Sequence, residues 1–159
     1  MIWFFLSSAI VIIVMLVVSK IFIVWLENKK IEACNTLNSL LKERRDYVDD
    51  LIDLVEEYSE ELDIVDVTIQ TRNTILQSSN LMQKKHNEEI LGYCLEKFFQ
   101  QAENCASLTN DKQYKEIMTK IKMLEKKIAT SRNQYSRVAN AYNKAISTFP
   151  LSIVASMFK

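Results

Sequence analysis

The side chains that could carry chemistry are sparse in this sequence and lack the spacing that a catalytic or metal site requires. The one histidine, His86, stands between lysines and an asparagine and has no second histidine at helical spacing, which a zinc site would need. It also has no visible nucleophile partner, so we predict a solvated surface histidine. Gly92 is the one glycine, so no glycine-rich phosphate loop can form. The sequence therefore predicts no enzyme, no cofactor or metal, and no small-molecule substrate.

The cysteines offer no alternative site. Their number is 3, and the positions Cys34, Cys94 and Cys105 do not have the spacing of metal ligands. Two of them fall on apolar helical positions. We predict reduced thiols that pack as small hydrophobic side chains.

Carboxylates are abundant in residues 46–63, where no basic residue interrupts the acidic ones. Carboxylates on a helix do not form the loop of side-chain and backbone oxygens that calcium prefers. We interpret the run as a solvated face, with a docking surface for a basic partner as the alternative. Residues 111–144 contain nine basic and three acidic residues, and packing of this segment beside the acidic run would neutralise both. The totals of 20 acidic and 20 basic residues argue against a nucleic-acid binder.

The composition predicts long helices. The chain has 1 glycine and 1 proline, whereas a sheet protein of this size would need more turn-forming residues. Apolar residues recur at spacings of three and four, interrupted by Arg44 and Arg72, and predict a helix over 30–77. A break near residues 58–60 is the alternative. Further helices are predicted over 81–106, after a serine–asparagine turn, and over 111–148. We expect an all-α fold: an N-terminal transmembrane helix that continues into an up-and-down, coiled-coil-like bundle of three to four long helices, spanning residues 29–150.

The N-terminal segment, residues 1–28, has the composition of a membrane anchor. Residues 2–18 carry no charge, and residues 2–25 as a helix would be about 36 Å long, enough to span a bilayer with tilt. Lys20 can extend its stem and place its ammonium among the headgroups. The aromatic residues suited to the two interfaces are Trp3, Phe4, Phe5, Phe22 and Trp25.

Two alternatives for this segment are a cleaved signal peptide and a pore lined by Lys20. A signal peptide would need a basic start and a small-residue cleavage site, and neither is present. No lysine or arginine precedes the span, whereas several follow it. The positive-inside rule then predicts a single-pass protein with its N-terminus outside and its C-terminal domain in the cytoplasm.

Two blocks of residues form a signature. In the first, Arg44 and Asp46 are followed by Leu51 and Val55 at apolar positions and by Tyr58 at the end. The second block comprises Glu125, Ile128, Arg132, Tyr135, Tyr142, Asn143, Phe149 and Pro150. Together with the N-terminal span, these blocks resemble the LemA family of bacterial membrane proteins over essentially the whole chain. The proline and glycine of the family's first block are replaced by Asp49 and Glu57.

The resemblance implies an N-terminal span followed by an up-and-down bundle, usually of four helices, in the cytoplasmic (inner) membrane of a bacterium. It implies no agreed biochemical activity, and it implies membrane metalloproteases or envelope proteins as genetic neighbours. A fourth helix would return the apolar tail, residues 151–159, towards the bilayer.

The leading functional hypothesis is a membrane-anchored, non-enzymatic scaffold or adaptor that acts through protein–protein contacts in envelope organisation. The apolar seam of residues 30–77 and the apolar tail favour a homo-oligomer. One alternative is a membrane-shaping protein whose tail and basic last helix contact lipid. The other is a regulatory partner of a membrane metalloprotease, which rests on the family resemblance.

Overall fold

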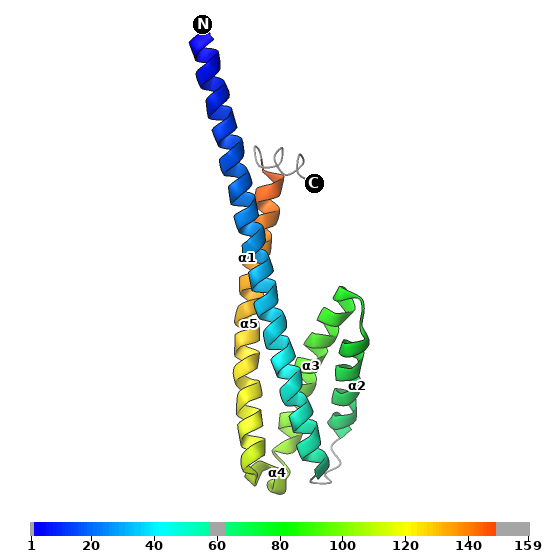
Figure 1. Ribbon diagram of the computed structural model, residues 1–159. Helices are drawn as coiled ribbons and strands as arrows, with labels where there is room; N and C mark the ends of the chain where they lie inside the picture. The colour runs from blue at the N-terminus through cyan, green and yellow to red at the C-terminus, as the bar shows by residue number, and fades with distance from the viewer. Residues whose placement is uncertain (1, 58–62, 149–159) are drawn as a thin grey trace. The chain divides into compact units, whose positions relative to one another are not determined.

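The computed structural model describes residues 2–57 and 63–148, and in these ranges every element is helical (Figure 1). This confirms the predicted all-α fold with a long apolar N-terminal helix and a helical bundle. The helices are α1 (Ile2–Glu57), α2 (Asp63–Gln77), α3 (Leu81–Ala102), α4 (Ala106–Asn110) and α5 (Lys112–Ser147).

The single helix predicted over 30–77 is divided in the structure. α1 ends at Glu57 and α2 begins at Asp63, and the alternative break near residues 58–60 lies outside the described residues. The division lets two segments of one seam face the same core, since Val55 of α1 and Ile75 of α2 are both buried in it. A continuous helix could not bring both side chains to one core.

Polar side chains cap the starts of α3 and α5. The side chain of Asn80 accepts a hydrogen bond from the backbone N–H of Met82 at 2.8 Å, which satisfies one of the orphan donors at the start of α3. The side chain of Asp111 accepts one from Tyr114 N–H at 2.7 Å at the start of α5. α3 ends at Ala102, short of the predicted residue 106, and α4 makes the turn into α5.

The chain divides into two compact units. The bundle unit, residues 39–129, contains the C-terminal part of α1, then α2, α3 and α4, and the first half of α5. Figure 1 shows α2 and α3 side by side and running in opposite directions. Each fully buried aliphatic or aromatic side chain of the core contributes roughly 1.5–3 kcal/mol. The residues at its centre include Val48, Leu51, Val55, Ile75, Leu91, Leu95, Phe98, Leu108 and Ile121.

The two-helix unit, residues 1–38 and 130–159, pairs the N-terminal part of α1 with the C-terminal part of α5. The ammonium of Lys30 lies 4.1 Å from the ring centroid of Tyr142, a cation–π contact between the two helices. Leu26, Ala33 and Ala145 are buried. The burial of Leu26 and Ala33, seven residues apart, fits a coiled-coil seam.

Candidate functional site

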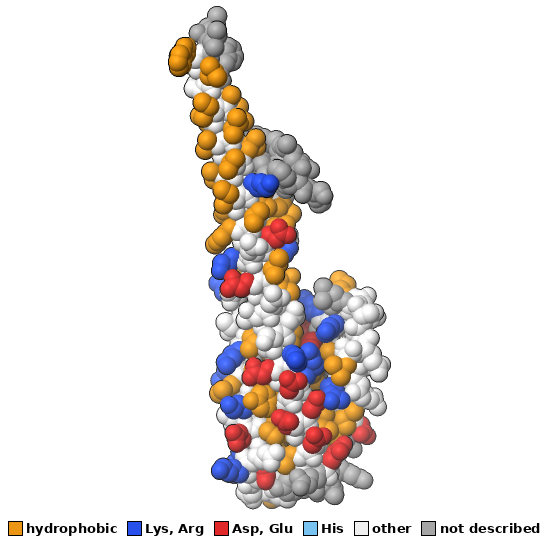
Figure 2. All heavy atoms as spheres, viewed as in Figure 1, with side chains coloured by type: hydrophobic (Ala, Val, Ile, Leu, Met, Phe, Trp, Pro, Cys, Tyr) orange, Lys and Arg blue, Asp and Glu red, His pale blue; other side chains and the backbone are white. Residues whose placement is uncertain are grey.

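The first candidate site is the N-terminal part of α1. Its most apolar 18-residue window has a mean hydropathy of 2.9, and 11% of that window is buried. A core helix of a soluble protein would be mostly buried, whereas these side chains point outward, as the hydrophobic surface in Figure 2 shows. Their exposed fractions include 59% at Ile10, 60% at Ile13 and 64% at Ile21. α1 is therefore long and apolar enough to cross a membrane.

The predicted interface residues lie at both ends of this apolar stretch. Trp3 and Phe4 are 85% and 80% exposed. Phe22 and Trp25 are also exposed and stack on each other with ring centroids 6.2 Å apart. The side chain of Phe5 lies outside the described residues. The side chain of Lys20, which belongs to the same helix, is exposed.

The second candidate site is a buried charge cluster inside the bundle unit, formed by Arg44, Arg45, Glu88 and Glu125. Arg44 of α1 is 1% exposed, and its Nη2 donates to Glu88 Oε2 at 2.6 Å and to the Glu88 carbonyl at 2.8 Å. Its Nη1 donates to Glu125 Oε1 of α5 at 2.6 Å. Arg45 Nη1 pairs with the second carboxylate oxygen of Glu88. One guanidinium thus joins α1, α3 and α5.

The cluster balances two positive with two negative side chains. Glu88 is 2% exposed, so its carboxylate depends on the two arginines for compensation, whereas Glu125 is 38% exposed and reaches solvent. The Nε of Arg44 is buried and has no hydrogen-bond partner among the described residues. Removing one member of such a pair costs several kcal/mol, because the remaining charge stays buried. The arrangement can hold three helices in one register.

Gly92 of α3 lies directly beside this cluster, and this explains a glycine in the middle of a helix. A Cβ at this position would lie 3.3 Å from Nη1 of Arg44 and 3.7 Å from Oε1 of Glu125. The 3.3 Å distance to Nη1 is shorter than an ordinary van der Waals contact. The glycine costs about 1 kcal/mol in helix propensity but leaves space for the guanidinium.

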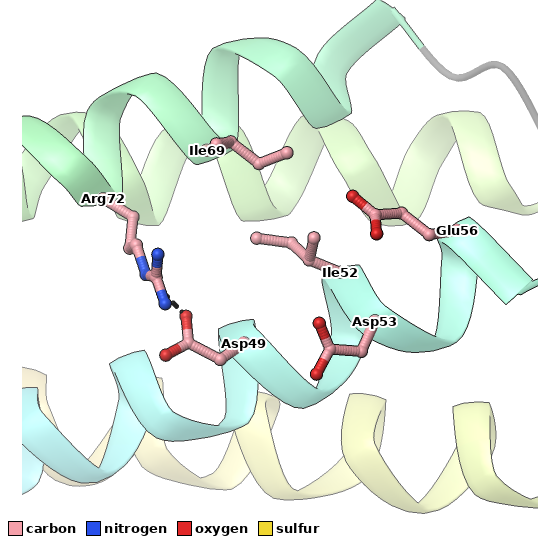
Figure 3. A pocket seen from close by; sticks show the side chains of 6 residues that line it. All are labelled: Asp49, Ile52, Asp53, Glu56, Ile69 and Arg72. Carbon is pink, nitrogen blue, oxygen red and sulfur yellow. Dashed lines mark ion pairs between the residues drawn. The ribbon is translucent and has the colours of Figure 1, made fainter.

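The third candidate site is an acidic groove between α1 and α2, with a volume of about 220 Å³ (Figure 3). Ile52 and Ile69 face each other across it. Arg72 Nε lies 2.6 Å from Asp49 Oδ1 and closes one end. The close contact with the Asp49 carboxylate raises the pKa of Arg72. The groove is lined by Asp49, Ile52, Asp53, Glu56, Ile69 and Arg72.

The acidic run of α1 is a solvent-facing surface in the structure. Asp46, Asp50, Asp53 and Glu56 are exposed, and Figure 2 shows acidic side chains gathered on this part of the molecule. The ion pair from Arg72 to Asp49 comes from α2, not from the basic stretch of α5. The groove thus presents an apolar floor with a negative rim.

The residues of the sequence signature are distributed over both units. Arg44 and Glu125, which belong to different blocks, meet in the buried charge cluster. Ile128 is buried in α5, and Asp46 is exposed. Arg132, Tyr135 and Tyr142 are half-buried, and Asn143 is exposed. Tyr58, Phe149 and Pro150 lie outside the described residues.

The histidine lies on the surface, and the cysteines lie at least partly inside the fold. His86 is exposed. Cys94 is buried, and Cys34 and Cys105 are half-buried. Within residues 2–57 and 63–148, no group of three potential ligands among His, Cys, Asp and Glu could hold a metal ion.

Sequence reasoning missed Glu88 and the role of Gly92. Glu88 stands three residues before Leu91, so it continues the apolar seam of α3 at its N-terminal end. Arg44 likewise interrupts the seam of α1. A charged residue within an apolar seam is expected to be buried with a partner of opposite charge. Arg44 and Glu88 both occupy such positions, so their ion pair could have been predicted on this ground.

Comparison with known proteins assigns the chain to a family. No curated protein matches the chain. Among known families, residues 33–159 match the LemA family. This range includes the whole bundle unit and both signature blocks, so the chain belongs to the LemA family.

Proposed function

We propose that this protein is a membrane-anchored, non-enzymatic helical scaffold that acts through protein–protein contacts. The observation that carries the proposal is the composition of α1. One helix bears the exposed apolar stretch near Ile13 and, further along, Arg44 at the centre of the bundle unit. Whatever binds the bundle is then held at the membrane by the same helix.

The buried charge cluster supports a scaffold more than a catalyst. The guanidinium of Arg44 is directed at two carboxylates and a carbonyl, and at 1% exposure it offers no surface to a substrate. A catalytic group must lie within hydrogen-bond reach of the atom on which it acts. The cluster is better suited to keep α1, α3 and α5 in register, so that the outer surface of the bundle has a defined shape.

The charges that flank the apolar stretch support one orientation. Lys29 and Lys30 follow the stretch, and no basic residue precedes it. By the positive-inside rule, the bundle lies on the cytoplasmic side of the membrane. The resemblance to bacterial membrane proteins of the LemA family supports the inner membrane of a bacterium as the location of the span. The acidic groove then faces cytoplasmic proteins or the cytoplasmic domains of membrane proteins.

The proposal is tested by photo-crosslinking in native membranes. A benzophenone amino acid replaces Asp53 in the groove, and a control places it at Tyr93 of α3, which is 60% exposed. We expect discrete protein adducts at residue 53 that are weak at residue 93. Deleting residues 2–25 should move the chain to the soluble fraction and remove the adducts. A chain that stays membrane-bound without these residues, or that gives the same adducts at both positions, would contradict the proposal.

A second candidate function is lipid contact by the C-terminal end, favoured by the register of the two-helix unit. Tyr142 lies opposite Lys30, and α5 runs antiparallel to α1 (Figure 1). From Tyr142 to Ser147 the helix rises about 7.5 Å, which brings its end level with Trp25. Trp25 is an interface residue of the proposed span, so α5 would end at the headgroups.

This candidate is tested with a single tryptophan at Ser147, after Trp3 and Trp25 have been replaced by phenylalanine. In bilayers with brominated lipids, we expect strong quenching if residue 147 reaches the interface. Fluorescence unchanged by bromination would remove lipid contact at this end.

A further inference from the structure

The acidic groove has the shape and charge of a docking site for a cationic segment with one apolar side chain. Its floor is made by Ile52, which is 8% exposed, and Ile69, which is half-buried. Its rim carries Asp53 and Glu56, both exposed. Arg72 pairs with Asp49 at one end, so the negative charge that remains is concentrated at Asp53 and Glu56. An apolar group on the floor and positive groups at the rim would satisfy both surfaces.

A surface of this kind lies on α5 of the same bundle unit. Met123 is 46% exposed, although the core side of α5 buries Ile121 and Leu124. At about 100° per residue, Met123 points roughly opposite to Ile121, away from the core. Lys120 and Lys127 lie about one turn before and after it, and both are exposed. We call these three residues, Lys120, Met123 and Lys127, the basic knob.

We propose that the acidic groove of one molecule binds the basic knob of a second copy of this chain. Met123 would rest on Ile52 and Ile69, and the two lysines would pair with Asp53 and Glu56 at the rim. The inference rests on the proposed scaffold function and names its partner as the protein itself. The balanced total of 20 acidic and 20 basic residues fits this contact, because the opposite charges are segregated on different helices.

The contact joins two different surfaces, so an open assembly keeps one free groove at one end and one free knob at the other, unless a ring closes. Molecules anchored in one bilayer would then assemble into rings or rows. Because the rim charges are exposed, salt should weaken the contact: the Debye length falls from about 10 Å at 0.1 M to about 3 Å at 1 M ionic strength.

The test is the mass of the full-length protein in mild detergent, measured by light scattering with correction for the detergent. We expect the unaltered protein to form oligomers that dissociate as salt rises. The groove variant Asp53→Lys/Glu56→Lys should be monomeric at the same concentration. The matched control Glu89→Lys/Glu96→Lys makes the same charge change on exposed positions of α3 and should stay oligomeric.

The charge swap decides the pairing. The knob variant Lys120→Glu/Lys127→Glu should be monomeric, and the variant with all four reversals should regain the mass of the unaltered protein. Helix content by circular dichroism serves to check that each variant is folded. Rescue by a second pair of charge reversals cannot arise from a folding defect, so it would establish the contact.

Three outcomes would overturn the inference: a monomeric unaltered protein, a groove variant that keeps its mass, or a swap that does not rescue. These outcomes do not decide the scaffold function. If the protein is monomeric but still gives anchor-dependent adducts at residue 53 with a different protein, the groove binds another partner and the scaffold proposal stands. If those adducts are absent as well, both proposals fail.

Discussion

The buried charge cluster predicts how substitutions of its members change the free energy of unfolding. Each substitution leaves a different set of charges without a partner. Replacing Glu88 by methionine leaves Arg44 with Glu125 and a backbone carbonyl, and leaves Arg45 without its partner. Truncating a buried pair costs about 3–5 kcal/mol. We expect about 3 kcal/mol for Glu88→Met, at the low end because Arg45 is 14% exposed and can turn to water.

Replacing Arg44 by methionine should cost less, about 2 kcal/mol, because Glu88 keeps Arg45 and Glu125 reaches solvent. The double variant removes both deeply buried charges. Replacement of buried ion pairs by apolar residues of similar volume is often neutral or better. We therefore expect the double variant to cost no more than about 2 kcal/mol, so that the coupling between the two sites is about 3 kcal/mol.

The assay is urea unfolding of the full chain in mild detergent, followed by circular dichroism, with the exposed Glu89→Met as a control expected to change the free energy of unfolding by less than about 0.5 kcal/mol. Additive single effects, within about 0.5 kcal/mol, would refute the reasoning. A cost below about 1 kcal/mol for Glu88→Met would also refute it, because the carboxylate could not then be the compensating charge for Arg44.

Three further predictions concern single residues of the bundle unit. Gly92→Ala should stabilise the protein by about 1 kcal/mol more in an Arg44→Met background than in the unaltered protein. In the unaltered protein, the 3.3 Å approach of the new Cβ to the guanidinium offsets the gain in helix propensity. Equal effects in both backgrounds, measured by urea unfolding, would contradict this. Burial raises the pKa of Tyr114 from 10.0 to about 12. The folded state favours the neutral phenol of Tyr114. This preference contributes about 2 kcal/mol to the free energy of unfolding below pH 10, and the contribution is lost as the pH rises towards 12. Tyr114→Phe should lose less stability than the unaltered protein between pH 9 and pH 12, and parallel losses would refute the assignment. Arg72→Met breaks the partly exposed pair with Asp49 and should cost less than about 1 kcal/mol, a cost that shrinks further in high salt; a larger, salt-independent cost would contradict this.

The apolar seams predicted the fold class and most of the core, because heptad spacing follows directly from helix geometry. Leu51 and Val55 of α1 and Ile117 and Ile121 of α5 have the spacing of four that helix geometry requires, and all four are buried. The period could not locate the end of α1, because the spacing continues in register across residues 58–62. Where the chain reverses depends on which surfaces pack together, and that is decided by tertiary contacts.

The candidate site was predicted only in part. Arg44 and Glu125 stood out as signature residues, but periodicity does not say that residues 81 positions apart will meet. Glu88 went unnoticed because a glutamate near a helix start reads as solvated. The sequence pattern gave no reason for a glycine at position 92, because the reason is steric and depends on where the guanidinium of Arg44 lies.

The most direct test of the central claim, that one helix links a bilayer span to a water-exposed bundle, is spin-label accessibility along α1 in reconstituted bilayers. Single labels at Val14 and Asp46 would be placed in a variant whose cysteines are replaced by alanine, and each label would be probed with oxygen and with a water-soluble nickel complex. We predict high oxygen and low nickel accessibility at Val14, and the reverse at Asp46. A label at Val14 that is reached by nickel, or shielded from both reagents, would contradict the membrane-anchored scaffold.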